Sequence, residues 1–298
     1  MTTRILQFGV TGQLARELLG QAKDFDVEIT ALSRAEADFA DPHAVVRRLD
    51  DVKADLVVLA AAYTAVDLAE SERDLAFKVN AETPGAIARA LGPDGPALVQ
   101  ISTDFVFAGD KGALYVESDP TAPLNVYGAS KLAGEQAILA ACPRALILRT
   151  SWVVSSHGKN FVKTMLRAAG EGRALKVVDD QFGRPTAARD LARFILGQAA
   201  RLAAAPAGDP AFGLHHFANV GEVTWKGFAD GIFDIALGGA APVVAAGSAA
   251  DWPSPARRPA RGTLDTSKLE QTFGVTLRPW REPLAEIVAE LQSERSAA

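Results

Sequence analysis

The chain has 298 residues, of which 48% are hydrophobic and 22% charged, which suits one α/β domain with a smaller attached domain. The formal net charge is −5 and no basic cluster is longer than Arg257-Arg258, so we expect no nucleic-acid partner. Cys142 is the only cysteine and the four histidines lack metal-ligand spacing, so we expect no disulfide and no metal. No apolar run reaches the roughly 18 residues of a bilayer span, and the chain enters a strand directly; we expect a cytoplasmic protein without membrane contact.

The first half of the chain predicts short strands that alternate with helices. Strands are expected over residues 4–9, 27–32, 55–60, 97–102 and 145–149, and helices over residues 13–23, 42–49, 71–91 and 125–141. Asp41 and Pro42 are typical of an N-cap and a first helical position, whereas Pro84-Gly85 predicts a kink in the third helix. This alternation predicts an α/β protein with a Rossmann-type, doubly wound parallel sheet.

The pattern changes after Ser151. Helices are expected over residues 161–170, 188–202, 224–237 and 282–294, with strands over residues 175–178 and 214–219 and no firm assignment for residues 238–250. The expected organisation is a dinucleotide-binding domain over residues 1–150. A smaller, mainly substrate-binding α+β lobe follows over residues 151–298, with some elements returning to the first domain.

A glycine turn follows the first predicted strand. It reads Gly9-Val10-Thr11-Gly12-Gln13-Leu14-Ala15. Glycine lets the backbone approach a pyrophosphate, and the following helix offers free N–H groups at its positive end. An ordinary strand–helix loop is the alternative, but the position after a first strand favours a dinucleotide cofactor.

The residues after the second and third strands are candidate contacts of the same cofactor. Ser33 and Arg34 follow the second strand without a carboxylate at its tip, so Arg34 favours the 2′-phosphate of NADPH over NADH. Arg34 as a solvated surface residue is the alternative. Asp38 and Phe39 are expected at the adenine, and the small residues of Ala60-Ala61-Ala62-Tyr63-Thr64 let a flat cofactor lie close, although tight helix packing also favours alanine.

Tyr127 and Lys131 stand one turn apart on a predicted helix face. A free tyrosine titrates near 10, and the Lys131 ammonium is expected to lower the pKa of Tyr127 and hold the nicotinamide ribose. Thr103 ends the fourth strand, where its hydroxyl can hold a substrate carbonyl oxygen, and Asp104 can orient it or bind a sugar hydroxyl. A turn at Thr103-Asp104 and a surface pair on the helix are the alternatives. Together with the glycine turn, these residues predict hydride transfer to or from a carbonyl carbon.

The glycine turn, the segment from Ser102 to Phe107 and the Tyr127-x-x-x-Lys131 pair together resemble the extended short-chain dehydrogenase/reductase superfamily. A narrower resemblance, over nearly the whole chain, is to the dTDP-4-dehydrorhamnose reductase family. It is carried by residues 60–67 (AAAYTAVD), 123–128 (PLNVYG), 149–153 (RTSWV), 180–186 (DQFGRPT), 255–259 (PARRP) and 264–266 (LDT). The resemblance implies reduction of the 4-keto group of dTDP-4-dehydro-L-rhamnose to dTDP-L-rhamnose by NADPH or NADH.

The resemblance also implies residue roles. Tyr127 is the implied proton donor with Lys131 as its partner, and Thr103 and Asp104 are implied sugar contacts. Val66 and Trp152 are implied to line the sugar pocket. Trp152 follows a strand on the cofactor side, where an indole can stack on a pyranose, although a buried core tryptophan is the alternative. Arg257 and Arg258 suit the nucleotide diphosphate.

Four positions depart from the family pattern. Phe105 stands where a tyrosine is usual, and Arg261-Gly262 replaces an Asn-Ser pair. Some members dimerise around magnesium held by glutamates; Glu17 matches one such position, but Arg189 replaces another carboxylate, which argues against a metal-bridged homodimer here. Two other functions stay open: a non-catalytic regulatory nucleotide-binding subunit and a sugar-nucleotide epimerase of the same fold.

Overall fold

A six-stranded sheet, parallel at every pairing, forms the centre of the computed structural model, which describes residues 2–172 and 174–296. Its strand order is β10-β5-β4-β3-β1-β2. The strands are β1 (Thr3–Phe8), β2 (Val27–Leu32), β3 (Leu56–Leu59), β4 (Ala97–Thr103), β5 (Ala145–Thr150) and β10 (Gly213–His216). The order runs outward in both directions from β1, which confirms the predicted Rossmann-type doubly wound sheet.

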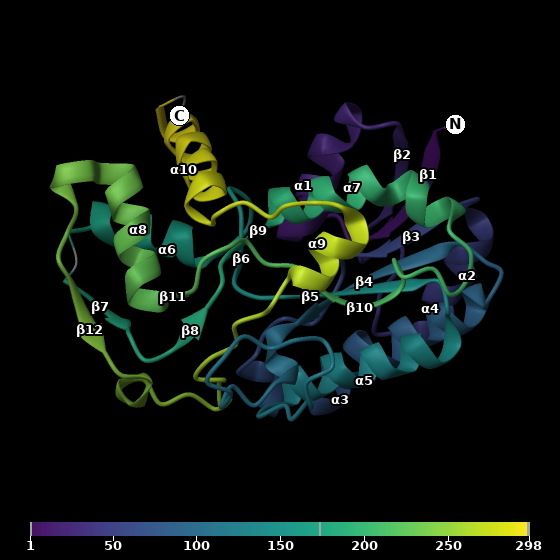
Figure 1. The fold of residues 1–298 in the computed structure, drawn as a ribbon, viewed down its shortest axis with the longest axis horizontal. Helices are drawn as coiled ribbons and strands as arrows, with labels where there is room; N and C mark the ends of the chain where they lie inside the picture. Colours follow the sequence, from purple (N-terminus) through teal and green to yellow (C-terminus); the bar gives the residue numbers. More distant parts are fainter. Residues whose placement is uncertain (1, 173, 297–298) are drawn as a thin grey trace.

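Helices cover both faces of this sheet, because successive residues of each apolar strand point to opposite sides. Ile5 of β1 packs in the core under α1 (Gln13–Gln21) and α7 (Ala188–Ala204), whereas Leu6 packs on the opposite side. Figure 1 shows α1 and α7 on one face, with α2 (Pro42–Asp51), α4 (Thr83–Leu91) and α5 (Val126–Ala141) on the other. The Asp41 carboxylate accepts the Ala44 N–H at 3.0 Å, which confirms the predicted N-cap of α2.

The helix predicted over residues 71–91 is built from several pieces. A 3₁₀ turn η2 (Leu68–Glu70) and the short α3 (Arg73–Phe77) lead into a π-helical segment η3 (Lys78–Glu82), which continues into α4. Pro84 lies in the first turn of α4, where its missing N–H is tolerated. The predicted kink at Pro84-Gly85 is therefore replaced by a π turn just before the proline.

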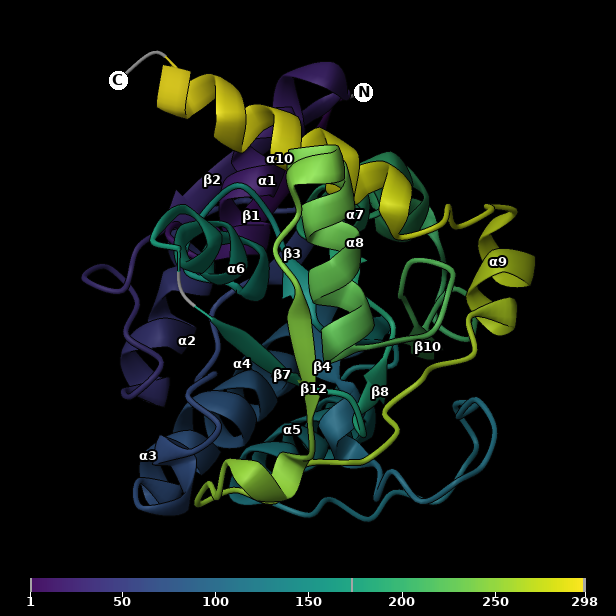
Figure 2. The same ribbon diagram turned by 90° about the vertical axis from the view of Figure 1, so that its left-hand side faces the viewer.

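The second half of the chain forms a lobe beside the carboxyl ends of the main strands (Figures 1 and 2). It contains the strand pairs β6 (Val153–Val154) with β9 (Thr186–Ala187), β7 (Leu175–Val178) with β12 (Val244–Gly247), and β8 (Phe182–Gly183) with β11 (Val223–Thr224). Its helices are α6 (Phe161–Gly170), α8 (Trp225–Leu237) and α10 (Arg281–Ser296). These elements share a separate apolar core around Phe228 and Trp280.

Three elements of the second half belong to the main sheet instead, the first of them being α7, which covers one face of it. The strand predicted over residues 214–219 is β10, which pairs with β5 and extends the main sheet. The short helix α9 (Ser267–Phe273) was not predicted; Leu269 and Phe273 anchor it in the main-sheet core. Short 3₁₀ turns complete the chain at η1 (Ala22–Asp24), η4 (Asp104–Val106), η5 (Gly238–Ala240) and η6 (Ala249–Asp251). None of the helices in the described part of the chain has the length and apolar character that crossing a membrane requires.

Candidate active site

The glycine turn lies between the end of β1 and the start of α1, as predicted. Gly9 has φ +101°, and a Cβ there would lie 3.1 Å from the amide nitrogen of Ala61. Only glycine adopts this conformation without strain while packing so closely on the segment after β3. The turn therefore leaves room beside the N-terminus of α1, where free N–H groups favour an anion.

A cavity of about 600 Å³ opens over this turn, at the carboxyl ends of β1, β2 and β3. Most of the predicted cofactor residues line it, namely Gly9, Thr11, Gly12, Ser33, Arg34, Asp38, Phe39, Ala60, Ala61, Ala62 and Tyr63. Five others are not among its walls: Tyr127 and Lys131, which are described below, and Gln13, Leu14 and Thr64. Leu14 packs in the core, and Gln13 joins the turn to the second half of the chain, with its amide donating to the Val153 carbonyl at 3.1 Å. Thr64 lies in the exposed loop after β3.

The end of β2 carries charges of both signs. The Arg34 side chain is 79% exposed and pairs weakly with Asp38 at 3.3 Å, so its guanidinium is free to reach an anion. Glu36, which the sequence reasoning missed, accepts bonds from the Ser33 N–H and hydroxyl at 2.9 and 2.7 Å. These bonds lower the pKa of the Glu36 carboxyl. Phe39 is buried with its ring edge-on to Phe8, so its side chain serves the core as well as the cavity wall.

Asn80 of the π turn is a second residue that the sequence reasoning missed. Its side chain bonds both backbone groups of Tyr63, accepting the N–H at 2.9 Å and donating to the carbonyl at 3.0 Å. It also donates to the Ser130 hydroxyl on α5 at 3.0 Å. Asn80 thereby joins the loop lining the cofactor cavity to the helix that carries Tyr127. Asn80 is 1% exposed, but the sequence shows only an asparagine within a predicted helix and gives no sign of this burial.

Helix α5 places Tyr127 and Lys131 on the face toward β4. Its first turn is capped by Asn125, whose side-chain oxygen accepts the Gly128 N–H at 2.7 Å. A Cβ at Gly128 would overlap the Phe105 carbonyl, so this glycine brings the helix against η4. The Phe105 and Tyr127 rings then meet edge-to-face at 5.6 Å.

The pKa of Tyr127 differs from the predicted direction. Burial raises it to about 12, with the Asp104 charge acting in the same direction and a hydrogen bond with Thr103 opposing both. The expectation that Lys131 lowers this pKa is wrong for this arrangement. The Lys131 ammonium donates instead to the Ile101 carbonyl at 2.6 Å, and burial lowers its own pKa to about 8.

Asp104 is buried beside Thr103. The Thr103 hydroxyl donates to the Asp104 carboxyl at 3.0 Å, and the Phe105 N–H donates to the Thr103 hydroxyl at 3.2 Å. Burial raises the pKa of Asp104 to about 7. A Cβ at Gly262 would overlap the second Asp104 oxygen. The departure from the family pattern at Gly262 therefore makes room for the Asp104 carboxyl.

A second cavity, of about 820 Å³, lies between the main sheet and the lobe. Asp104, Trp152, Arg257 and Arg258 line it, together with the aromatic residues Phe105, Phe161, Phe182, Trp225 and Trp252. Tyr127, Lys131 and Thr103 are in the walls of neither cavity. Tyr127 contacts Phe105 and Thr103 contacts Asp104, and both of these partners line the second cavity. Lys131 bonds the Ile101 carbonyl, two residues before Thr103.

Trp152 is held in a strained backbone conformation. Its φ of +47° is the one positive value at a non-glycine residue in residues 2–172 and 174–296, and such strain costs on the order of 1–3 kcal/mol. Its indole stacks on Trp225 with ring centroids 3.5 Å apart. A Cβ at Gly183 would overlap the same indole. Trp225 and Gly183 thus fix the Trp152 ring in the cavity wall.

The two arginines predicted for the diphosphate differ in environment. Arg258 forms a bidentate pair with Asp67, at 3.0 and 2.7 Å, which neutralises its charge and lowers the pKa of Asp67. Arg257 is exposed in the cavity wall, and its carbonyl accepts the Asn125 amide at 2.7 Å. Val66 precedes Asp67 and is not among the residues that line the cavity.

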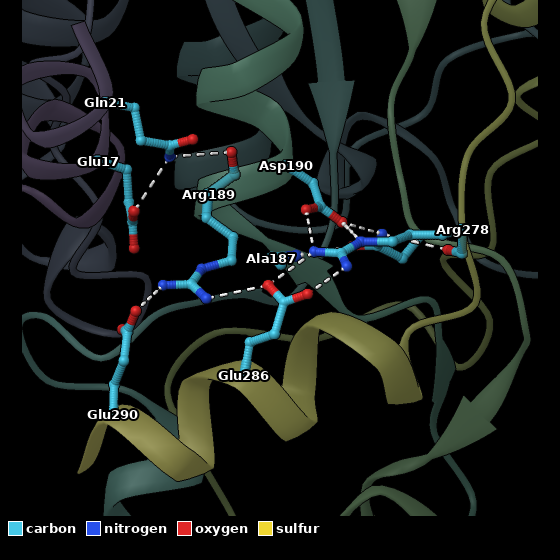
Figure 3. Close-up of polar contacts among 9 residues, drawn as sticks. Glu17, Gln21, Ala187, Arg189, Asp190, Arg278, Glu286 and Glu290 are labelled. Atoms are coloured by element: carbon cyan, nitrogen blue, oxygen red, sulfur yellow. Dashed lines mark hydrogen bonds and ion pairs between the residues drawn. The ribbon is translucent and has the colours of Figure 1, made fainter. Parts of the chain in front are cut away.

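The implied magnesium position is occupied by a side-chain cation. Figure 3 shows Arg189 of α7 between Glu17 of α1 and the two glutamates of α10. Arg189 pairs with Glu286 at 3.0 Å and with Glu290. Glu17 is 5% exposed with one oxygen unbonded, and its pKa is raised by burial despite the Arg189 charge. A divalent cation among these carboxylates would be repelled by the guanidinium, so the residues present do not fit a magnesium site. Nowhere in the described residues are three or more His, Cys, Asp or Glu side chains grouped to hold a metal.

Comparisons with known proteins match the whole of this architecture. The family model described as "RmlD substrate binding domain" matches residues 3–293. A dTDP-4-dehydrorhamnose reductase of Burkholderia thailandensis is 42% identical, covering 98% of this chain and 100% of its own. The chain belongs to the dTDP-4-dehydrorhamnose reductase family.

Solved structures of this family superpose closely. The crystal structure of a dTDP-4-dehydrorhamnose reductase from Clostridium acetobutylicum gives a TM-score of 0.89 at 37% identity, covering 97% of this chain and 99% of its own. The Bacillus anthracis dTDP-4-dehydrorhamnose reductase, solved in complex with NADP, also gives 0.89, at 33% identity, covering 97% of this chain and 100% of its own. The resemblance inferred from the motifs is therefore confirmed at the level of family and fold.

Proposed function

We propose that the protein reduces the 4-keto group of dTDP-4-dehydro-L-rhamnose to give dTDP-L-rhamnose, with NADPH or NADH as reductant. The observation that carries this proposal is that Thr103 and Tyr127 contact Asp104 and Phe105 of the second cavity, at the same carboxyl edge of the sheet as the glycine turn, with Lys131 on the Ile101 carbonyl beside them. Full-length relatives named for this reaction support the substrate, and NADP in the Bacillus anthracis structure supports the cofactor.

The first cavity suits a nicotinamide nucleotide. The strain-free turn at Gly9 and the open N-terminus of α1 would hold its diphosphate, and Arg34 or Ser33 would meet the adenosine ribose. The bound cofactor would supply the hydride for the carbonyl carbon. The chain itself supplies the proton and the geometry.

Tyr127 is the proposed proton donor. With its pKa raised to about 12, the phenol is protonated at neutral pH and can transfer its proton to the substrate oxygen as that oxygen gains negative charge. Thr103 would donate a hydrogen bond to the same oxygen. The Lys131 ammonium, which donates to the Ile101 carbonyl, would hold the nicotinamide ribose hydroxyls, the other role expected for it.

The second cavity suits a nucleotide-linked sugar. The Trp152 indole, fixed by its stack on Trp225, would cover one face of the pyranose, and Asp104 would bind a sugar hydroxyl. Arg257 is the exposed cation for the diphosphate, and Arg258, already paired with Asp67, would orient the loop. Val66 at the sugar stays a prediction.

Three broader predictions accompany this function. We propose the division into residues 1–150 for the cofactor and 151–298 for the substrate, a cytoplasmic location, and, if the protein forms a homodimer, one without a bridging metal. A regulatory subunit has no use for a buried Tyr–Lys–Thr set. An epimerase would recycle its cofactor rather than consume it.

One assay distinguishes these functions. The purified protein is mixed with the dTDP-4-keto sugar and NADPH or NADH, and loss of reduced-cofactor absorbance is followed together with the sugar product. Stoichiometric oxidation is expected; none with either cofactor would refute the reductase. Tyr127→Phe should lower kcat at least roughly 100-fold, the usual range for a general acid. Tyr115→Phe is the matched control, because the Tyr115 hydroxyl bonds backbone N–H groups of a loop instead.

A further inference from the structure

A buried ion pair lies behind the proposed catalytic residues. Glu135 of α5 and Arg149 of β5 are each 2% exposed and form a bidentate pair, with nitrogen–oxygen distances of 2.9 and 2.6 Å. The Ser102 hydroxyl of β4 donates to the same carboxylate at 2.5 Å. One carboxylate thus ties α5 to two neighbouring strands.

The Ser102–Glu135 contact lies between the contacts that the proposed catalytic residues make with β4. The consecutive residues at the end of β4 each meet a different side chain of α5. Ile101 accepts from Lys131, Ser102 donates to Glu135, and Thr103 hydrogen-bonds with Tyr127. Glu135 follows Lys131 by four residues, and Lys131 follows Tyr127 by four, so all three share one face of the helix.

An ion pair is an expensive way to attach a helix. Removing two charges from water costs several kcal/mol per ion, and apolar residues of similar volume often hold the same elements equally well. Arg149 also lies over the Phe107 ring at 5.0 Å, and one of its nitrogens has no partner among the described residues. Attachment alone therefore does not account for the pair.

We propose that Glu135 is a positioning residue for the reduction proposed above: its carboxylate holds α5 in register on β4 and β5, so that Tyr127 meets Thr103 and Lys131 meets the Ile101 carbonyl. The same negative charge also favours the protonated form of Lys131. The neighbouring strand ends offer Lys131 no second counter-charge, since Ser102, Thr103 and Thr150 are neutral and Arg149 is paired. Asn80, from the packed π turn, is neutral, and the Asp104 charge acts on Tyr127.

Two variants test the proposal. Glu135→Gln removes the charge but leaves Arg149 buried and unpaired, which can prevent folding. The double variant Glu135→Leu with Arg149→Met replaces the pair by apolar side chains and is expected to fold. The control is Asp190→Asn. Asp190 belongs to α7, not to α5, and forms a partly buried ion pair with Arg278.

Two measurements are made on each folded variant. The kcat of ketone reduction is expected to fall roughly 10- to 100-fold in the apolar double variant, as for a misplaced catalytic group, while the KM for the cofactor changes far less. The Lys131 ammonium is titrated by NMR of Cε-labelled lysine, assigned with Lys131→Arg. Loss of the Glu135 charge should lower the pKa of Lys131 by about one pH unit. The pH above which kcat falls should decrease by the same amount.

The outcomes separate this proposal from the function on which it rests. Wild-type kcat and an unmoved Lys131 titration in a stably folded double variant would overturn it, as would equal losses of kcat in the Asp190 control. If the wild type oxidises no cofactor with the dTDP sugar, the reductase proposal fails. The Lys131 titration still decides whether Glu135 acts on the lysine.

Discussion

The buried Asp104 carboxyl makes a direct prediction about stability and pH. In the native protein its pKa is about 7, against an ordinary value of 3.8, because burial disfavours the charged form. Between these values the native state holds a proton that the unfolded chain has released. Stability from this group is therefore present below about pH 4 and is lost as the pH rises toward 7.

The substitution Asp104→Asn removes this titration while keeping the shape of the side chain. The amide oxygen can still accept the Thr103 hydroxyl, which now donates to the carboxyl at 3.0 Å. A pKa rise from 3.8 to about 7 corresponds to at most about 4 kcal/mol at pH 8. The variant should thus match the wild type near pH 4 and become progressively more stable than it up to pH 8.

Urea unfolding at several pH values measures this difference. Asp119→Asn is the matched control with the opposite sign, because the Lys111 ammonium and the Val116 N–H lower the pKa of Asp119. That control should be less stable than the wild type at pH 7, with the difference vanishing as the pH falls below the Asp119 range. The quantity compared is the difference in free energy of unfolding between the Asp104→Asn variant and the wild type. If this difference is the same at pH 8 as at pH 4, the argument from burial is refuted. We expect the stabilised variant to reduce the ketone more slowly, because the Asp104 carboxyl is the proposed contact of a sugar hydroxyl.

Other substitutions test the two cavities and the Arg189 cluster. Arg34→Ala should lower kcat/KM for NADPH relative to NADH roughly tenfold, through loss of one charged contact; an unchanged ratio contradicts the 2′-phosphate role. Gly183→Ala should push the Trp152 indole aside, raise the KM for the sugar and destabilise by about 1–3 kcal/mol in urea, whereas a wild-type KM would mean that Trp152 does not contact the sugar. Arg189→Glu should make Tm rise with added Mg²⁺ in the variant but not in the wild type, because it replaces the internal cation by another carboxylate; a metal response in the wild type would contradict our view of the cluster.

Local signals in the sequence determined the fold and the centre of the site. The apolar strands, the Asp41 cap and the helical spacing of Tyr127 and Lys131 depend on neighbours a few residues away, so they could be predicted from short windows. Gly9 was predictable for the same reason, because a turn between strand and helix next to a phosphate site needs a residue without a side chain.

Contacts between distant segments decided the hydrogen-bond partners, the ion pairs and the pKa values of the site residues. The spacing put Lys131 beside Tyr127, but its ammonium binds the Ile101 carbonyl, and burial sets the pKa values of both residues. Arg257 and Arg258 look alike in sequence, yet only the second meets Asp67, 191 residues away. The sequence by itself therefore determined which residues gather at the carboxyl ends of the strands. Tertiary structure alone decided which charges are paired, because desolvation and ion pairing depend on everything packed around a group and not on its neighbours along the chain.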